Sequence, residues 1–233
     1  MTIEEPLVLR HDRADGLTTL TLNRPGQFNS LSKDMLTAVK AELDAIAANE
    51  AVRVVVLAGA GKAFCAGHDL KEMRANHSKG FMQALFKQVG ELMLTLTRLP
   101  QPVIARVHGI ATAAGCQLVS MCDLAVAADV AKFAVSGINV GLFCSTPAVG
   151  LARNLGRKAA LEMLLTGEFI DAMEAKAKGL VNQVVPADAL DVEIERLAQS
   201  ILAKSAVAVR IGKGMFYKQL EMDLTEAYDY AGE

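Results

Sequence analysis

Two loops rich in small residues are the parts of this chain best suited to hold a ligand by its backbone. They read GAGKAFCAGHDL at 59–70 and HGIATAAGC at 108–116, and each follows a predicted strand and begins a predicted helix. Such turns leave backbone N–H groups free at a helix N-terminus, where the helix dipole adds positive potential. Small side chains let a ligand reach that backbone. The two loops therefore favour binding of an anion or of an oxygen that becomes negative during a reaction.

Each loop taken alone also has a purely structural explanation. Small residues at the end of a strand allow tight packing against a neighbouring element. The segment GAGKAF is neither a Rossmann nor a P-loop pattern, so no nucleotide-binding site is predicted.

Two strands and a helix must position the first loop. The alternating run LTTLTL at 17–22 predicts a strand, and the β-branched run VRVVVLAG at 52–59 predicts a strand covered on both faces. Between them, apolar residues recur at helical spacing, with Ser32 as the predicted N-cap: Leu36, Val39, Leu43 and Ile46. This order predicts a β-α-β unit.

The rest of the chain continues this alternation. A second helix with an apolar face from Phe81 to Leu96 ends at LPQP, 99–102, because proline cannot continue it. The predicted elements that follow are the strand VIARVHG, the strand DLAVAA, helices ending in Gly167 and Gly179, the strand VNQVV, and a mostly helical segment at 188–220. We therefore predict one functional α/β domain, with a core at 1–190 and a helical C-terminal part at 191–233.

Composition excludes several classes of function. The 233 residues carry a formal charge of −2 without long runs of one sign, so we expect no nucleic-acid or membrane partner. No segment approaches the length of a membrane span, and the first residues lack the pattern of a signal peptide. The expected location is the cytoplasm, or an organelle matrix if a transit segment has been removed.

The four cysteines do not indicate a metal site or a disulfide framework. Cys65, Cys116, Cys122 and Cys144 lie in apolar surroundings without CxxC spacing, so we expect buried thiols. No metal or redox cofactor is expected.

Several linked motifs together resemble one known family. KAFCAGHDLKEM, then PVIARVHGIATAAGCQLVSMCDLAVAAD, then LARNLGRKAALEMLLTGEFIDAMEAKAKGLVNQVVP, are similar in order and spacing to the enoyl-CoA hydratase/isomerase (crotonase) superfamily. The NRPGQFNSLS segment fits as well, so the resemblance covers about residues 7–220. Within the superfamily, the chain resembles the group of enoyl-CoA hydratase domain-containing protein 3.

The resemblance implies a fold, a ligand and an assembly. The implied fold is a crotonase-like spiral of β-β-α turns, and the implied ligand is a coenzyme A thioester of fatty acid metabolism. Family members form trimers or dimers of trimers. Two backbone N–H groups make an oxyanion hole for the thioester carbonyl, and motif matching places them on Ala66 and Ala114. Such donors stabilise an enolate because they are already oriented toward the developing charge.

The same matching predicts the residues that surround the ligand. The residues expected at the coenzyme are Gln27, Phe28, Ala63, Ala66, His68, Asp69 and Leu70. The residues expected at the acyl end are Ile110, Ala114, Gln117, Gly137 and Ser145.

Both glutamates that the family's hydratases use are absent. Gln117 stands at the position of the first glutamate and Gly137 at that of the second. An amide can hold a water but cannot exchange a proton near neutral pH, and glycine has no side chain. We therefore expect hydration and double-bond isomerisation to be slow, because each lost acid or base lowers the rate by about 10²–10⁴-fold.

Other residues could replace the missing acids, but each has a plainer explanation. The pKa of an ordinary histidine lies near neutrality, so His68 could move protons, although it could equally be a partly exposed loop residue near the coenzyme. Asp69 could be the N-cap of the next helix, Cys144 a small packing residue and Ser145 a hydrogen-bonding loop residue. Arg106 and His108 are expected to make packing or subunit contacts.

Three hypotheses therefore stand at this point, and the last of them is a chain that serves mainly as a trimer scaffold and has no affinity for the coenzyme. The first is a crotonase-fold enzyme, nominally a hydratase or isomerase of the lyase class, that acts on an acyl-CoA through an enolate. Decarboxylation of a malonyl-type thioester would suit the site, because it builds an enolate without prior removal of a proton. The second is a protein that binds or sequesters acyl-CoA without turnover. The chain also stops earlier than family members usually do, so we expect either a shortened C-terminal part or a less closed acyl pocket.

Overall fold

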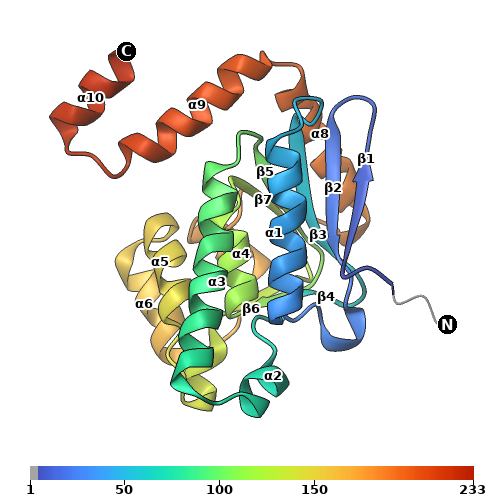
Figure 1. The fold of residues 1–233 in the computed structure, drawn as a ribbon, viewed down its shortest axis with the longest axis vertical. Coiled ribbons are helices and arrows are strands. Elements are labelled where there is room, and N and C mark those ends of the chain that lie inside the picture. The colour runs from blue at the N-terminus through green and yellow to red at the C-terminus, as the bar shows by residue number, and fades with distance from the viewer. Residues whose placement is uncertain (1–4) are drawn as a thin grey trace.

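The larger of two sheets forms the centre of the molecule in the computed structural model, which describes residues 5–233. Its strand order is β1-β2-β3-β5-β7-β10 (Figure 1). The strands are β1 (Val8–Asp12), β2 (Leu17–Leu22), β3 (Val54–Gly59), β5 (Val103–Val107), β7 (Leu124–Ala128) and β10 (Gln183–Val185). Only the β1–β2 pair is antiparallel in this sheet. The strands predicted at 17–22 and 52–59 are confirmed as β2 and β3.

A smaller sheet is formed by short strands, and two of them, β4 and β6, lie inside the segments that the sequence predicts as loops. Its order is β4-β6-β8-β9, with β4 at Ala63–Cys65, β6 at Ile110–Thr112, β8 at Lys132–Ala134 and β9 at Ile170–Asp171. The first three strands follow β3, β5 and β7 directly along the chain, and a helix comes next each time. This repetition confirms the predicted spiral of β-β-α turns.

Three helices cover one face of the larger sheet (Figure 1). They are α1 (Lys33–Ala47), α3 (Lys79–Arg98) and α4 (Ala114–Met121). The predicted apolar face of α1 is fully buried, and Ser32 caps that helix by accepting from the Met35 N–H at 3.2 Å. The short helix α2 (Leu70–Ala75) precedes α3, which ends before the prolines of LPQP.

The opposite face of the sheet is covered by α8 (Leu190–Leu202). Leu190, Ile194 and Ala198 are buried there against β3, β5 and β7. The predicted boundary between 190 and 191 thus falls at the first residue of a helix that packs on the core. Between β8 and β10 the chain forms η2 (Ser136–Val140), α5 (Ser145–Asn154), α6 (Arg157–Thr166) and α7 (Ala172–Ala177), and η3 (Ala187–Ala189) precedes α8.

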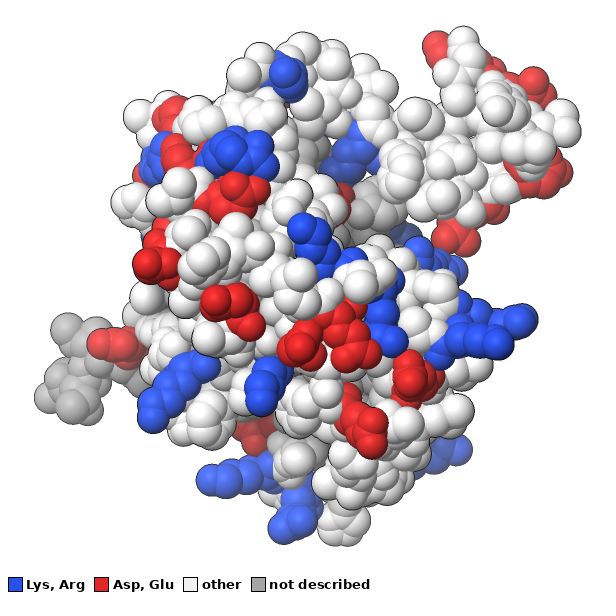
Figure 2. Space-filling model, turned by 180° about the vertical axis from the view of Figure 1, so that it is seen from behind, with Lys and Arg blue, Asp and Glu red and all other residues white. Residues whose placement is uncertain are grey.

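The last two helices project from the body as an arm (Figure 1). They are α9 (Ala206–Gln219) and α10 (Leu224–Gly232), and neither has a buried residue. Seen from behind, the body carries basic and acidic side chains interspersed, while the end of the arm is mainly acidic (Figure 2). No helix within residues 5–233 is long and apolar enough to cross a membrane.

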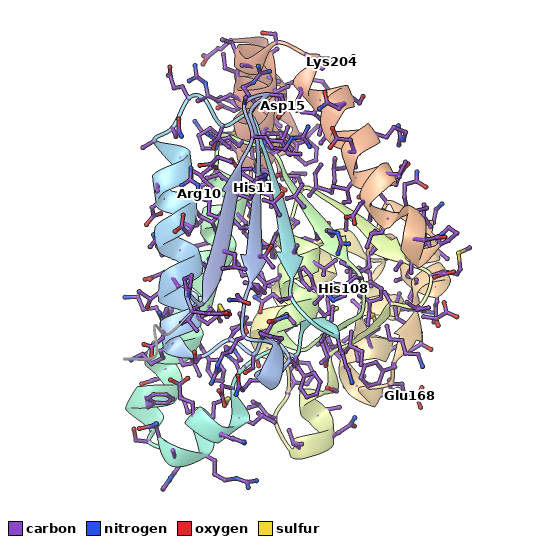
Figure 3. The ribbon with its side chains drawn as sticks, turned by 90° about the vertical axis from the view of Figure 1, so that its right-hand side faces the viewer. Arg10, His11, Asp15, His108, Glu168 and Lys204 are labelled. Carbon is purple, nitrogen blue, oxygen red and sulfur yellow. The ribbon has the colours of Figure 1, made fainter. Side chains whose placement is uncertain are left out.

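Two polar residues at the end of β5 make structural contacts. Arg106 pairs with Asp191 of α8 at 2.5 Å. His108, labelled in Figure 3, bonds the Gly61 carbonyl through Nε2 at 2.9 Å. These contacts agree with the packing role expected for both residues. The four cysteines are buried and free, and burial raises the pKa of the Cys65 and Cys116 thiols to about 12.

Candidate functional site

The two small-residue loops lie against each other. Gly67 has a φ of +86°, and a methyl group added there would lie 3.0 Å from the Ala114 nitrogen. A methyl group added at Gly115 would overlap the carbonyl oxygen of Cys65 in β4. Only glycine allows both the backbone conformation at 67 and this close approach. The glycines therefore bring the end of β4 next to the first turn of α4.

The free backbone donors differ from the predicted pair. The Ala66 N–H donates to the Phe28 carbonyl at 3.0 Å, so the prediction that Ala66 supplies an oxyanion-hole donor is wrong. Leu31 pairs with the next residues, because its N–H donates to Gly67 and its carbonyl accepts from Asp69. This pairing leaves the His68 N–H without a bond to Leu31. In the part of the chain that the structure describes, neither the His68 N–H nor the Ala114 N–H has an acceptor.

The backbone at the second loop is strained where α4 begins. Ala113, the N-cap, has φ 50° and ψ −120°, a conformation that a residue with a Cβ rarely adopts. Backbone strain of this kind costs about 1–3 kcal/mol and concentrates at functional sites. Ala114 is the first residue of α4, where a backbone N–H has no acceptor within the helix.

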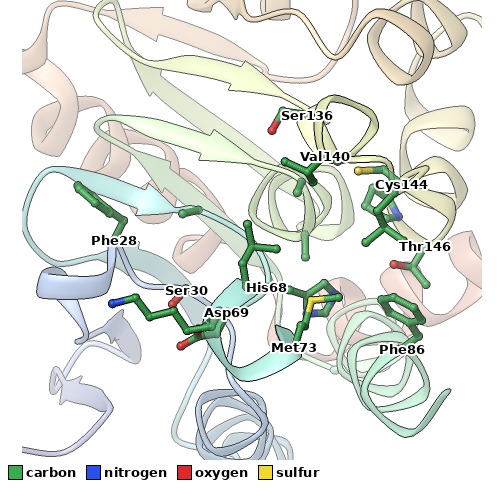
Figure 4. Close-up of a pocket in the computed structure, with 18 of the residues that line it drawn as sticks. Phe28, Ser30, His68, Asp69, Met73, Phe86, Ser136, Val140, Cys144 and Thr146 are labelled. Atoms are coloured by element: carbon green, nitrogen blue, oxygen red, sulfur yellow. Dashed lines mark hydrogen bonds between the residues drawn. The ribbon is translucent and has the colours of Figure 1, made fainter. Parts of the chain in front are cut away.

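A cavity of about 460 Å³ opens beside these donors (Figure 4). Figure 4 shows Phe28 on one side and Cys144 and Thr146 on the other, with His68 between them. The predicted residues that line it are Gln27, Phe28, Ala66, His68, Asp69, Leu70, Ala114, Gly137 and Ser145. The structure thus brings together residues from four separate parts of the sequence.

Three predicted residues do not line the cavity. Ala63 and Ile110 are backbone partners in the smaller sheet, where Ala63 is buried and Ile110 is exposed. Gln117 is buried within α4, and its Oε1 atom has no hydrogen-bond partner among the described residues. Gln117 is therefore not among the residues that line the cavity.

Asn29 shapes one side of the cavity and was missed from the sequence. It is fully buried with a φ of 55°, and its Nδ2 donates to the Ala63 carbonyl at 2.8 Å and the Phe64 carbonyl at 3.2 Å. Its Oδ1 accepts from the Arg24 N–H at 2.9 Å. Asparagine adopts left-handed backbone more readily than most residues. The asparagine at the end of NRPGQFN was the sequence feature that could have indicated this role. Its hydrogen bonds hold the segment with Gln27 and Phe28 against β4.

Asp69 caps α2, as predicted, and also forms an ion pair. Its carboxylate accepts from the Lys71 and Glu72 N–H groups and lies 2.7 Å from Arg24 Nη1. Burial raises the pKa of Asp69, but the hydrogen bonds from Arg24 and from the Glu72 backbone outweigh it and leave the pKa below its usual value. Asp69 is the one carboxylate among the described residues that line the cavity, and it is already engaged.

Gly137, at the position of the second family glutamate, has no space around it for a longer side chain. A methyl group added at Gly137 would lie 2.5 Å from the Leu142 carbonyl oxygen and 2.7 Å from Cys144 Sγ. Cys144 is itself nearly buried, and burial raises the pKa of its thiol. The loop after η2 therefore occupies the space that a longer side chain would need.

His68 presents an uncharged imidazole at the cavity wall. Its ring lies edge-on to Phe86, with centroids 5.6 Å apart, and both ring nitrogens are buried without a partner from residues 5–233. Burial lowers the pKa of His68 to about 4. The ring is therefore neutral at physiological pH.

Met73 and Phe86, which belong to the apolar wall of the cavity, were also missed from the sequence. The main residues of this wall are Met73, Phe86, Val140, Leu142 and Phe143. Phe86 lies beside the main apolar stripe of α3. Helical periodicity alone therefore does not predict that Phe86 contacts a ligand or the core. The apolar run at 140–143 in a loop was the one available signal for this wall, because loops are usually polar.

Comparison with known proteins finds one matching family model and similar sequences. The family model described as enoyl-CoA hydratase/isomerase matches residues 12–231. Enoyl-CoA hydratase domain-containing protein 3, mitochondrial, from Rattus norvegicus is 43% identical over 229 residues, which cover 98% of this chain and 76% of the relative.

Two solved structures are also similar. A crystal structure of an enoyl-CoA hydratase from Mycobacterium smegmatis is 60% identical, with a TM-score of 0.97 over 98% of this chain and 89% of that chain. The human enoyl-CoA hydratase domain-containing protein 3 is 42% identical, with a TM-score of 0.93 over 97% and 89% of the two chains.

Proposed function

The chain belongs to the enoyl-CoA hydratase/isomerase family, and on that premise we propose that its cavity binds an acyl-CoA thioester. The thioester carbonyl would accept hydrogen bonds from the backbone N–H groups of His68 and Ala114. One observation carries this proposal: these two N–H groups have no acceptor among residues 5–233, although they belong to adjacent loops at the wall of one cavity.

The proposed chemistry is stabilisation of an enolate. Each oriented N–H group contributes about 10²–10³-fold to the rate of a reaction that places negative charge on the carbonyl oxygen. Hydration also needs a proton donor and acceptor, and the family's two positions hold a buried amide and a glycine. We therefore propose a nominal hydratase or isomerase in which ordinary hydration is slow. Neither binding nor enolate stabilisation by these donors requires a metal or redox cofactor.

Removal of one backbone N–H tests the carbonyl contact. Lactic acid in place of Ala114 converts the amide to an ester and deletes the N–H while it keeps the methyl side chain. We expect butyryl-CoA to bind about tenfold more weakly, since one buried hydrogen bond is lost. The thioether S-butyl-CoA has no carbonyl, so its affinity should not change. The same replacement at Ala66 is the control, and it should leave the ratio of the two affinities unchanged.

Turnover is tested with crotonyl-CoA. Loss of enoyl absorbance follows the reaction, and calorimetry with the same ligand follows binding. Rapid hydration would contradict the proposed role of the missing glutamates. Absence of binding for every acyl-CoA and for the thioether would contradict the proposed site itself.

A second candidate function is acyl-CoA binding without turnover. The observation that favours it is the engagement of Asp69 by Arg24 and the N-terminus of α2, which leaves the cavity without a free carboxylate among its described lining residues. A carrier would bind several acyl-CoA thioesters and convert none of them. A panel of thioesters that includes a malonyl-type thioester separates the two functions when product formation is measured. An enzyme that stabilises an enolate should decarboxylate the malonyl-type thioester, because this reaction needs no general base, whereas a carrier should form no product.

We also propose that the chain assembles as a homotrimer or a dimer of trimers. Large apolar side chains are exposed on the arm: Val207, Ile211, Phe216, Leu220, Leu224 and Tyr228. A neighbouring subunit would bury them. Sedimentation should give three or six times the chain mass of 24.8 kDa. Ile211→Asp with Phe216→Asp should shift the protein to smaller species, whereas Val192→Asp on exposed α8 surface should not.

The proposed location is an aqueous compartment, either the cytoplasm or an organelle matrix. The rat and human relatives are named as mitochondrial proteins. Cell fractionation of the native host tests this proposal.

A further inference from the structure

The imidazole of His68 is a buried polar group for which the described residues supply no partner. Both ring nitrogens are shielded from solvent, and neither makes a hydrogen bond within 3.5 Å to residues 5–233, although the Leu31 backbone lies close enough to oppose the lowering of the His68 pKa. The neighbours in the cavity include the Phe86 ring, which meets the imidazole edge-on at 5.6 Å, and the side chain of Met73 (Figure 4). These neighbours hold the ring in place without satisfying its nitrogens.

A buried polar group without a partner is unfavourable, so a ligand that supplies the partner binds more tightly. A neutral imidazole offers one N–H donor and one lone pair. A keto or hydroxyl oxygen complements such a ring. A carboxylate complements it poorly, because burying a charge without a cation costs more than a neutral hydrogen bond returns.

Chain connectivity places the ring next to the acyl group. In the proposed complex the backbone N–H of His68 binds the thioester carbonyl, and the imidazole belongs to that same residue. His68 and Ala114 line one cavity, so in the proposed complex the carbons that follow the carbonyl share that cavity with the ring. Around them the cavity wall is formed mainly by Met73, Phe86, Leu142 and Phe143.

We infer that the His68 imidazole is a specificity-determining contact that hydrogen-bonds a keto or hydroxyl oxygen on the acyl chain near the thioester. The site then favours oxygen-bearing acyl groups over plain hydrocarbon acyl groups of the same length. This inference rests on the proposed acyl-CoA function and adds a role for the side chain of His68.

Matched ligands and variants test the inference by calorimetry. The ligands are butyryl-CoA, 3-oxobutyryl-CoA, 3-hydroxybutyryl-CoA and malonyl-CoA. The unmodified protein should bind the 3-oxo or 3-hydroxy ligand about tenfold more tightly than butyryl-CoA. Its affinity for malonyl-CoA should not exceed its affinity for butyryl-CoA. His68→Phe keeps a ring of similar shape and should make the affinities for the 3-oxo and 3-hydroxy ligands equal to that for butyryl-CoA. His77→Phe changes an exposed histidine and should keep the preference.

A spectroscopic measurement on the unmodified protein avoids dependence on the folding of a variant. The ¹⁵N signals of the His68 ring should shift when 3-oxobutyryl-CoA is added and should stay in place with butyryl-CoA. Equal affinities for all four thioesters would overturn the inference and leave the proposed function standing. The same would follow if the ¹⁵N signals of the His68 ring were equal with 3-oxobutyryl-CoA and with butyryl-CoA. Failure of every thioester to bind would instead remove the proposed function.

Discussion

Lys213 of α9 lies 2.6 Å from Asp123, which sits between α4 and β7, and this pair fastens the C-terminal arm to the core. Both side chains are largely buried, and Lys213 Nζ also donates to the Leu96 and Gln101 carbonyls at 2.9 Å. Tyr217 adds a hydrogen bond to the other oxygen of Asp123. Burial lowers the pKa of Lys213, so its charge depends on this carboxylate.

Loss of the lysine should release the arm. In Lys213→Met, Asp123 stays buried without its cation, and removal of one partner of a buried pair costs about 3–5 kcal/mol. We expect chemical denaturation to show this loss in the free energy of unfolding, and hydrogen exchange to show faster exchange of α9 amides. Lys204→Met, an exposed change before α9, is the control. Unchanged exchange in α9 would show that other contacts hold the arm.

Acid should destabilise the protein through His68. The ordinary pKa of histidine is 6.5 and burial lowers that of His68 to about 4, so between these values the unfolded chain binds a proton that the folded chain excludes. The free energy of unfolding therefore falls as the pH falls. From pH 7 to pH 5 the unmodified protein should lose about 2 kcal/mol more than His68→Phe. Parallel losses in the two proteins would mean that His68 is solvated in the folded state.

Asn29 should matter for both stability and binding. Asn29→Ala removes hydrogen bonds to the Ala63 and Phe64 carbonyls, and unsatisfied buried groups cost about 1–3 kcal/mol each. We expect a loss of about 2–4 kcal/mol in the free energy of unfolding and weaker binding of acyl-CoA, measured by denaturation and calorimetry. Asn76→Ala on the exposed end of α2 should change neither quantity appreciably. Full binding by the Asn29 variant would show that the 25–29 segment needs no such anchor.

A side chain added at position 137 should destabilise the protein and should not restore hydration. Gly137→Ala places a methyl group 2.5 Å from the Leu142 carbonyl oxygen, and overpacking of this kind costs about 1–3 kcal/mol. The combination of Gln117→Glu with Gly137→Glu is therefore expected to destabilise the cavity loop rather than restore hydration. Gly90→Ala in α3, where the added methyl group meets nothing, should instead stabilise the protein by about 0.5–1 kcal/mol. Thermal unfolding and the crotonyl-CoA assay measure both effects.

Much of the fold follows from local patterns in the sequence. The strands β2 and β3, the buried face of α1, the Ser32 cap and the αL glycine at Gly167 all depend on neighbouring residues. The strands β4 and β6 were not predicted because each has only three residues, and pairing across the smaller sheet stabilises them.

The sequence by itself determined which chemical groups are present: two small-residue loops, and a glutamine and a glycine where the family's hydratases have glutamates. Tertiary structure alone decided which groups are free to act. The Ala66 N–H is occupied because Phe28, distant along the chain, accepts from it, whereas the His68 and Ala114 N–H groups have no acceptor among residues 5–233. Burial in the assembled cavity, and not residue type, sets the neutral state of His68. Hydrogen-bond partners and solvent exclusion come from segments far apart in the sequence, so local spacing does not encode them.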